Sequence, residues 1–438
     1  MIHTVTDLKS TFSPERHALF SNYLPVLVEV LNEFHGVNYS IRFWSFILSD
    51  YIQGYITKQA GVENKSNAIK KTDLWKKKLI HTFKVLFKRS KSHEVYNVIK
   101  NHNSLHIGFP KLSEVDDDLG KALPYYMWDL KVRFKKETRE RLLEICSLYD
   151  SNLSNLINGI PAELLEGFET VFNRIPLFNP TEKIFHYHLG SNFHKWVLAK
   201  YTENGAKLFW YQHGAYYGEM NYGVHVSERK LADVYRTWGW KLDEKDEPWK
   251  AYRLIKFKER FDSISVTSAT SGILIPLTGL RPQAIKKQNA PVLDYLEANL
   301  DMDHYKLLLA RPRPTNKVFS RKSSFKNVVP SCFTLTSGLK RIQEEMKQVS
   351  VVITPVIPAT IFLECIHVDF PIVGLLTNDQ PTEIIKPFYD FFLEQQVLHI
   401  TIESLVTHLN TVDIASWWER IIAMPPYLQF KATFANTY

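Results

Sequence analysis

The sequence predicts an α/β protein with two Rossmann-like domains that face a cleft, together with a helical amino-terminal region. From residue 183 onward, short apolar runs of strand length alternate with segments of helical periodicity. The chain has 438 residues, which exceeds what one hydrophobic core usually serves. A charged stretch at 241–250 separates two alternating regions. We therefore predict one domain over 1–250 and a second over 251–438.

The amino-terminal region is expected to be mainly helical up to about residue 175. A serine and a proline at positions 13 and 14 are typical of a helix start, because proline is tolerated in the first helical turn. Apolar residues then recur at helical spacing. The predicted helices begin near this proline and cover 42–58 and 137–156.

A βαβ unit is predicted where the alternation begins. It has a strand over 184–188, a helix over 193–201 and a second strand over 208–211. A unit of this length joins parallel strands through a right-handed crossover. Further strands are expected at 272–276, 305–309, 351–354, 372–376 and 397–401.

The charge distribution is uneven. The formal net charge is +8, and the segment 65–91 holds ten basic residues against one acid, Asp73. Aromatic and leucine residues recur within it at helical spacing, so it reads as a basic amphipathic helix. A solvated lysine face and a contact with an anionic membrane surface both fit this pattern. Nucleic acid is disfavoured as a partner, because no recognition motif accompanies the charge.

The cysteines and the hydropathy favour a cytoplasmic protein. The three cysteines lie far apart, with neither zinc spacing nor an even disulfide set. The amino terminus lacks a secretory signal pattern, and no run approaches the roughly 20 apolar residues of a membrane span. We expect any membrane contact to be peripheral, on the inner membrane.

The stretch 207–240 is the first candidate for a site. Its first strand ends at Gln212 and His213, and the carboxyl edge of a parallel sheet is where α/β proteins present groups to ligands. The two side chains are suited to orienting a sugar or passing a proton. Asp233 stands immediately before the next strand and is a candidate nucleophile or base. An ion-paired surface aspartate is the alternative.

Two further segments carry candidate ligands for anions. Arg311 and Arg313 follow a strand and alternate with prolines, so their guanidinium groups are suited to a carboxylate or phosphate. A structural ion-pair corner fits the same residues equally well. Thr360 and Glu364 lie one turn apart in a helix that follows a strand and a proline loop, an arrangement typical of a phosphate site. A simple helix start with a paired glutamate is the alternative.

Metal and several enzyme classes receive little support. The acidic motifs at 116–118 and 301–303 do not end apolar strands, as the metal motif of sugar transferases does. The chain lacks the sequence motifs of serine hydrolases, P-loop kinases, dinucleotide-dependent dehydrogenases and zinc proteases. We expect no metal and no cofactor.

Several segments, in this order, resemble a family of bacterial transferases encoded with surface-polysaccharide genes and related to the retaining β-Kdo glycosyltransferases. They include RFWSFILSDYI from residue 42, PAELLEGF from 161, NGAKLFWYQHGAYYG from 204, LADVYRTWGW from 231 and ATIFLECIHVDFPIVGL from 359. The resemblance covers most of the chain. It implies a GT-B architecture with an acceptor-side amino-terminal domain and a nucleotide-sugar domain that follows, in which the last helices cross back.

The resemblance also implies a reaction and roles for residues. The implied reaction transfers Kdo, a 3-deoxy-2-ulosonic acid, from CMP-Kdo to a lipid-linked or oligosaccharide acceptor of a surface polysaccharide, such as lipopolysaccharide or capsule, with retention. Asp233 is implied as the nucleophile and Glu166 as a second site carboxylate. The arginines would hold the Kdo carboxylate or the phosphate, and Thr360 with Glu364 the nucleotide. A transferase of another activated sugar and a non-catalytic polysaccharide-binding or assembly protein are the alternatives.

The chain departs from the family pattern at two places. Two glycines usually follow the Gln-His pair, whereas this chain has Gly214 and Ala215, which restricts the backbone. An Arg-Pro-Arg-Pro sequence replaces the expected corner of an apolar residue, proline and histidine. Both differences bear on the identity of the donor sugar more than on the fold.

Overall fold

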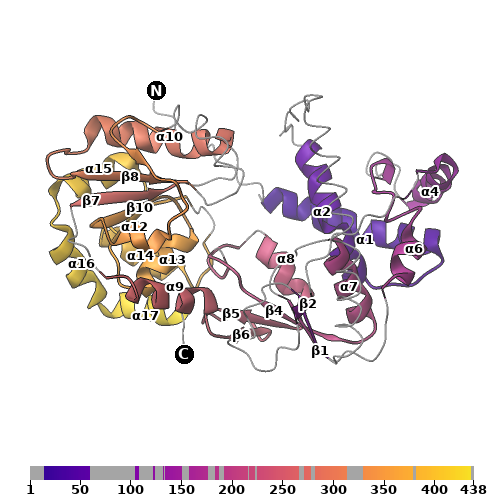
Figure 1. The fold of residues 1–438 in the computed structure, drawn as a ribbon. Helices are drawn as coiled ribbons and strands as arrows, with labels where there is room; N and C mark the ends of the chain where they lie inside the picture. Colours follow the sequence, from indigo (N-terminus) through magenta and orange to yellow (C-terminus); the bar gives the residue numbers. More distant parts are fainter. Residues whose placement is uncertain are drawn as a thin grey trace. The chain divides into compact units, whose positions relative to one another are not determined.

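The computed structural model describes most of the chain, and its α/β architecture confirms the predicted class. The described residues are 14–59, 104–107, 122–123, 132, 134–149, 157–175, 183–186, 192–215, 217–221, 224–265, 271–277, 282–312, 329–377 and 381–435. They form two compact units, and their strands lie in two sheets of six strands (Figure 1). The basic segment 65–91, the acidic motif at 116–118 and Arg313 lie outside the described residues.

The division between the units differs from a single boundary at residue 250. One unit comprises Ser10–Tyr211 and Tyr222–Tyr235, and the other includes Gln212–Asn221 and Arg236–Tyr438. The loop that follows the strand ending at Tyr211 therefore packs with the carboxyl-terminal unit. Its long-range contacts explain this, because they go to residues more than a hundred positions later.

The helices of the amino-terminal unit pack through an aromatic core. They are α1 (Pro14–His35), α2 (Ile41–Gln59), α4 (Lys136–Tyr149), α6 (Phe168–Asn173), α7 (Asn192–Glu203) and α8 (Val224–Leu231). The His35 ring stacks on Phe168 at 4.2 Å between centroids, and Trp44 stacks on the same phenylalanine at 5.4 Å. Burial in this cluster lowers the pKa of His35 to about 4, even though the Leu164 carbonyl opposes the shift. The imidazole is thus a neutral core group.

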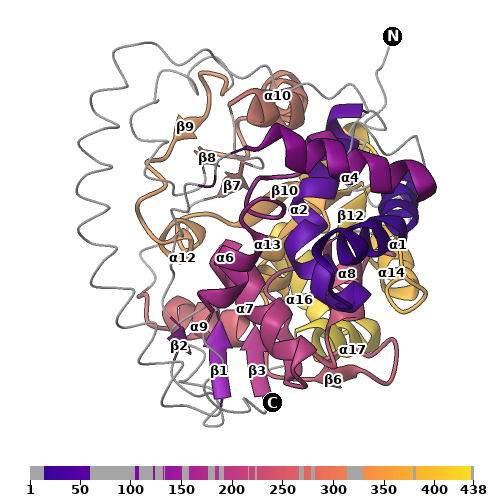
Figure 2. The same ribbon diagram turned by 90° about the vertical axis from the view of Figure 1, so that its right-hand side faces the viewer.

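The sheet of the amino-terminal part has six strands in the order β2-β1-β3-β4-β5-β6. Their bounds are β1 (Ser104–Ile107), β2 (Ala122–Leu123), β3 (Lys183–His186), β4 (Lys207–Tyr211), β5 (Val234–Thr237) and β6 (Asp246–Pro248). β3 and β4 run parallel and α7 joins them, so the predicted βαβ unit is confirmed. α7 also packs against α2, and β1 and β3 lie side by side (Figure 2).

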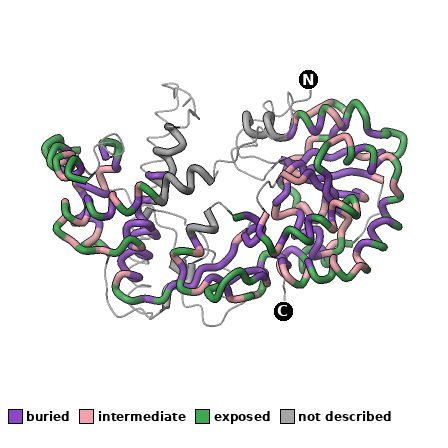
Figure 3. Tube along the Cα trace, turned by 180° about the vertical axis from the view of Figure 1, so that it is seen from behind, coloured by how far each residue is buried: buried purple, intermediate pink, exposed green. Residues whose placement is uncertain are grey.

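The carboxyl-terminal unit contains a second parallel sheet of six strands in the order β12-β11-β10-β7-β8-β9. The strands are β7 (Gly272–Pro276), β8 (Leu307–Arg311), β9 (Thr334–Leu335), β10 (Val351–Ile357), β11 (Ile372–Leu376) and β12 (Leu398–His399). The helices are α9 (Tyr252–Asp262), α10 (Pro282–Asn299), α12 (Ile342–Met346), α13 (Thr360–His367), α14 (Lys386–Glu394), α15 (Ile402–Thr411), α16 (Ile414–Ile422) and α17 (Pro425–Phe434). Figure 3 shows the central strands buried, as expected of an apolar parallel sheet.

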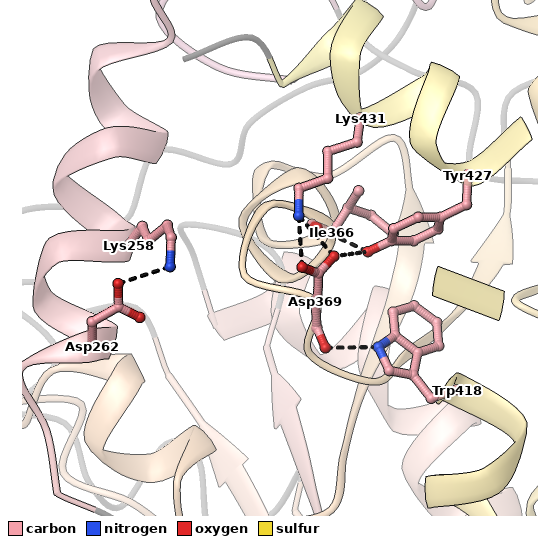
Figure 4. Close-up of polar contacts among 7 residues, drawn as sticks. All are labelled: Lys258, Asp262, Ile366, Asp369, Trp418, Tyr427 and Lys431. Atoms are coloured by element: carbon pink, nitrogen blue, oxygen red, sulfur yellow. Dashed lines mark hydrogen bonds and ion pairs between the residues drawn. The ribbon is translucent and has the colours of Figure 1, made fainter. Parts of the chain in front are cut away.

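Asp369, in the turn after α13, fastens the last two helices to this sheet. Its carboxylate accepts hydrogen bonds from Lys431 Nζ at 2.7 Å and from the Tyr427 hydroxyl at 2.8 Å (Figure 4). Its backbone carbonyl accepts from Trp418 Nε1 at 2.8 Å. The residue has a positive φ of 54°, a conformation that aspartate tolerates better than most residues. We call these four residues the Asp369 clamp.

Candidate functional site

The loop Gln212–Asn221 is held in one shape by the Gln212 amide. Its Oε1 accepts from the Trp238 backbone N–H at 2.8 Å and from Trp240 Nε1 at 2.7 Å, while Nε2 donates to the Gly214 carbonyl at 2.8 Å. The side chain is buried. These contacts engage the amide with its own chain, so the structure assigns Gln212 a supporting position rather than an exposed one.

The far end of this loop is fixed to the carboxyl-terminal unit. Gly218 has a φ of +78°, and a Cβ there would come within 2.5 Å of the Trp240 ring, so only glycine fits. The Thr382 hydroxyl donates to the Gly218 carbonyl, and the Tyr389 hydroxyl donates to the Glu219 carboxylate at 2.8 Å. The loop is therefore a fixed part of this unit.

His213 is the half-buried ionisable group of this loop. The Tyr217 hydroxyl lies 2.8 Å from its Nδ1 and 3.1 Å from its Nε2, and the two rings meet edge to face. A hydroxyl at this position selects the imidazole tautomer through its own donor or acceptor role. His213 thus has the support that a proton-transferring imidazole requires.

The amino terminus of α13 contacts the loop that carries this histidine. α13 follows β10, and its N-cap is Ala359, which has no side-chain acceptor for the first helical N–H groups. The Thr360 hydroxyl accepts from the Ala215 backbone N–H at 3.3 Å, and a Cβ on Gly214 would lie 3.3 Å from the same hydroxyl. The loop and the helix terminus therefore form one local surface, where the helix dipole favours an anion.

Glu364, one turn along α13, is paired with an arginine that the sequence did not single out. Arg253 Nε in α9 donates to Glu364 Oε1 at 2.9 Å. The glutamate side chain is 8% exposed, whereas the arginine side chain is 47% exposed. The pairing favours the alternative of a paired glutamate over a free ribose acceptor.

Arg311 forms a buried ion pair at the end of β8. Its guanidinium donates to Glu345 Oε2 in α12 and to the carbonyls of Gly338 and Lys340. Both charged side chains are nearly inaccessible to solvent, and a buried charge requires such compensation. This arrangement favours the structural ion-pair corner over a donor-binding role for Arg311.

Asp233 lies at the amino end of β5 and is engaged by three donors. Arg42 Nη1 and Nη2 donate to its two carboxylate oxygens at 3.1 and 2.8 Å, and the Leu208 N–H donates to Oδ2 at 2.7 Å. Leu208 is near the beginning of β4, whereas Gln212 and His213 follow its last residue. Asp233 is thus at the opposite strand end from those two residues, and the arrangement favours an ion-paired aspartate.

Glu166, the second predicted carboxylate, is also bound by an arginine. Arg139 Nε and Nη2 donate to its two oxygens at 3.0 and 3.1 Å, and the Lys135 N–H donates at 3.2 Å. Burial alone would raise the pKa of Glu166, but these hydrogen bonds outweigh burial and lower it below its ordinary value. The carboxylate stays ionised and joins α4 to the turn before α6.

Two features of the described residues concern metal binding and membrane crossing. Those residues contain no group of three or more histidine, cysteine, aspartate or glutamate side chains arranged to hold a metal ion. The motif at 301–303 instead closes a turn, in which Asp301 Oδ1 accepts from the Asp303 N–H at 3.0 Å. Within the same described ranges, no helix is long and apolar enough to cross a membrane.

Arg253 and Tyr217 are the site residues that sequence reasoning missed. Arg253 is one of several basic residues in α9, and no spacing distinguishes it from the others. Tyr217 lies four positions after His213 in a loop with several tyrosines. The tyrosine-rich composition was visible, but its pairing with the histidine depends on the loop conformation.

Comparisons with known proteins give one match in sequence and several distant likenesses in structure. The model of the LIC12162 family transferase matches residues 56–438. No curated protein sequence matches the chain.

The solved structures that resemble the chain include the wall teichoic acid polymerase TagF, with 10% identity, a TM-score of 0.32, and coverage of 84% of this chain and 94% of that chain. MnaA of S. aureus with UDP gives 11% identity, a TM-score of 0.37, and coverage of 76% and 91%. A glycosyltransferase from Rickettsia africae gives 12% identity, a TM-score of 0.35, and coverage of 78% and 90%.

Proposed function

The chain belongs to the LIC12162 family of transferases, and we propose that it is a glycosyltransferase acting in surface-polysaccharide synthesis. The proposed donor is CMP-Kdo and the proposed acceptor is a lipid-linked or oligosaccharide glycan. The proposal combines the family's transferase activity with the sequence resemblance to β-Kdo glycosyltransferases. The parallel α/β sheets with a helical amino-terminal region agree with the GT-B class of that resemblance.

One observation carries the proposal: the His213 loop lies against the amino terminus of α13. The helix terminus supplies N–H groups and a positive dipole end, which suit the phosphate of an activated sugar. Thr360 joins the helix to the loop through its contact with Ala215. The loop that carries His213 therefore contacts a helix terminus suited to an anion, an arrangement that supports general base catalysis of a group transfer from a phosphate ester.

The proposed reaction needs one group that stabilises the leaving CMP and another that accepts a proton from the acceptor hydroxyl. The bond between the sugar anomeric carbon and the phosphate oxygen breaks, and its electron pair leaves with CMP, whose charge the α13 terminus stabilises. The acceptor hydroxyl forms the new bond to the anomeric carbon and gives up its proton. His213, oriented by Tyr217, is the group that receives this proton.

Retention through a covalent Asp233 adduct stays a finer prediction from the resemblance. Two successive displacements at the anomeric carbon would give it, with the aspartate as the first nucleophile. Such an adduct would need the sugar at the opposite strand end from His213, and the attacking oxygen would first have to lose the Arg42 or Leu208 donor. Intact-protein mass spectrometry after mixing with CMP-Kdo tests whether a sugar adduct forms.

The direct test is release of CMP from CMP-Kdo in the presence of glycan acceptors. We expect release by the native protein and a loss of about 100-fold in kcat for His213→Gln, since general base catalysis contributes about 10²- to 10⁴-fold. Asn221→Ala, on an exposed residue at the end of the same loop, is the matched control. Release from UDP- or dTDP-sugars instead would indicate another donor. A protein that binds CMP but releases no nucleotide from any activated sugar would favour the non-catalytic polysaccharide-binding alternative.

A further inference from the structure

Two consecutive residues of the loop Gln212–Asn221 are held by α14 and the turn before it. The Thr382 hydroxyl donates to the Gly218 carbonyl, and the Thr382 N–H donates to the Glu219 carbonyl at 3.1 Å. The Tyr389 hydroxyl donates to the Glu219 carboxylate at 2.8 Å. Thr382 and Tyr389 are each 2% exposed, so water does not readily replace either donor. One short segment therefore fixes both the backbone and a side chain of this loop.

The two donors belong to a well-packed part of the carboxyl-terminal unit. The Thr382 carbonyl accepts from the N–H groups of Ile385 and Lys386 at 3.2 Å, so Thr382 is part of the turn that begins α14. Tyr389 lies within this helix, which packs against α17 and β12. Groups carried by a packed helix hold their positions more precisely than groups on a loop. The loop thus takes its shape from a rigid neighbour.

The position of Gly218 in the chain connects these contacts to His213. Gly218 directly follows Tyr217, whose hydroxyl lies 2.8 Å from His213 Nδ1. Gly218 also packs against the Trp240 ring, so its conformation is restricted from a second side. A shift of the Gly218 carbonyl would move the backbone that carries Tyr217, and with it the hydroxyl that meets the imidazole. Displacements of about 1 Å around a catalytic group can cost on the order of 100-fold in rate.

We propose that Thr382 and Tyr389 are positioning residues for His213, because they hold the loop so that the Tyr217 hydroxyl meets the imidazole. This inference deepens the proposed function, and its kinetic part rests on it. The two residues act through Gly218 and Glu219, without contact with the substrate. Loss of a single buried hydroxyl in α14, or in the turn before it, should therefore slow proton transfer while donor binding stays the same.

The kinetic test is CMP release from CMP-Kdo by the full chain, with kcat and KM measured separately. We expect Thr382→Val to lower kcat by about 10-fold and Tyr389→Phe by about 3- to 10-fold, as for a general base that is displaced but present. Thr382→Ser keeps the hydroxyl donor and should restore the native kcat. The KM for CMP-Kdo should stay within about twofold, because the lost interaction acts on the transition state and not on the bound donor.

NMR of the histidine ring nitrogens reports on His213 without turnover. The signals of His213 are those that disappear in His213→Gln. A neighbouring hydroxyl influences the imidazole tautomer, so we expect Tyr217→Phe to shift these signals. Thr382→Val and Tyr389→Phe should shift them in the same direction. Tyr427→Phe is the matched control, because it removes another buried hydroxyl of this unit, one that donates to a carbonyl of α13. It should leave kcat and the His213 signals unchanged.

The outcomes distinguish this inference from the proposed function. Native His213 signals in Thr382→Val and Tyr389→Phe would overturn the positioning role, whatever their kcat, and leave the transferase proposal standing. A loss of kcat that Thr382→Ser does not restore would also overturn it. Shifted signals in both variants, with normal CMP release by His213→Gln, would support the positioning role and overturn the role of His213 in transfer. If Thr382→Val does not fold, Tyr389→Phe decides, because it removes one oxygen atom and keeps the ring.

Discussion

The Asp369 clamp allows a stability prediction in which backbone and side chain contribute separately. Asp369 has a φ of 54° and accepts hydrogen bonds from Lys431 and Tyr427. Burial raises the pKa of the Tyr427 hydroxyl far above its ordinary value, so this group remains protonated and donates. Substitution of Asp369 by Ala, Gly and Asn removes different parts of this arrangement.

The magnitudes follow from exposure and conformation. The Lys431 and Asp369 side chains are 26% and 42% exposed, so solvent screens their ion pair and it contributes about 0.5 to 1 kcal/mol. The hydrogen bond from Tyr427 adds about 1 kcal/mol, because that hydroxyl also has the Ile366 carbonyl as an acceptor at 2.9 Å. A left-handed alanine costs about 1 kcal/mol more.

We therefore expect the free energy of unfolding to fall by about 3 kcal/mol in Asp369→Ala and by about 1 kcal/mol in Asp369→Asn. Asparagine keeps an acceptor for Tyr427 and tolerates the left-handed conformation. Asp369→Gly should be more stable than Asp369→Ala by about 0.5 to 1 kcal/mol, because glycine relieves strain but raises the entropy of the unfolded chain.

Urea unfolding followed by tryptophan fluorescence measures these differences. Trp418 donates to the Asp369 carbonyl, and Trp417 packs beside it at 5.3 Å between ring centroids, so these two of the ten tryptophans contribute a signal from next to the clamp. Lys431→Ala is the matched partner variant, with an expected loss of about 0.5 to 1 kcal/mol. An Asp369→Ala variant as stable as Asp369→Gly would refute the backbone argument. An Asp369→Asn variant as unstable as Asp369→Ala would refute the argument from the acceptor.

Two further predictions concern the ion-paired aspartate and the buried histidines. Asp233→Asn and Arg42→Gln should each destabilise the protein by about 1 kcal/mol, with a coupling of similar size in the double variant, because the pair is bidentate but about one-third exposed. CMP release by the same variants decides the catalytic question: loss in Asp233→Asn alone would support the nucleophile, and equal activity in both would support the ion-paired alternative. Burial lowers the pKa of His399 and of His408 from 6.5 to about 4. The unfolded chain therefore binds protons first as the pH falls, so the stabilisation is complete above about pH 6.5 and is lost between about 6.5 and 4. His408→Gln should make the free energy of unfolding less steeply dependent on pH in that window, as measured by urea titrations, and an unchanged pH slope would contradict this.

The sheets were predictable because their signals are local. β7, β10 and β11 are short apolar runs bounded by glycine, proline or polar residues, and their predicted positions hold with small shifts at the ends. β8 begins two residues later than predicted, at Leu307, because Tyr305 packs in the core before the strand begins. Its ring is buried and its hydroxyl donates to the Leu409 carbonyl, so an apolar ring was mistaken for part of the strand.

The partners of the candidate residues were not predictable from local patterns. Glu364 pairs with a residue 111 positions away, Asp233 with one 191 positions away and Arg311 with one 34 positions away. Neither spacing nor composition encodes such pairs, since they depend on how helices pack on a sheet. A single sequence does not distinguish a charged residue that forms an ion pair from one that binds a ligand.

The position of Asp233 was nevertheless deducible from strand direction. A residue that precedes a strand lies at its amino end, and residues that follow a parallel neighbour lie at the carboxyl end. Leu208 pairs with Asp233 and Gln212 with Arg236, so β4 and β5 run in the same direction. The stretch 207–240 therefore provides His213 at one strand end and the ion-paired carboxylate of Asp233 at the other. Further groups for a site at this strand end must come from segments that follow other strands, and Thr360, which follows β10, contacts the same loop through Ala215.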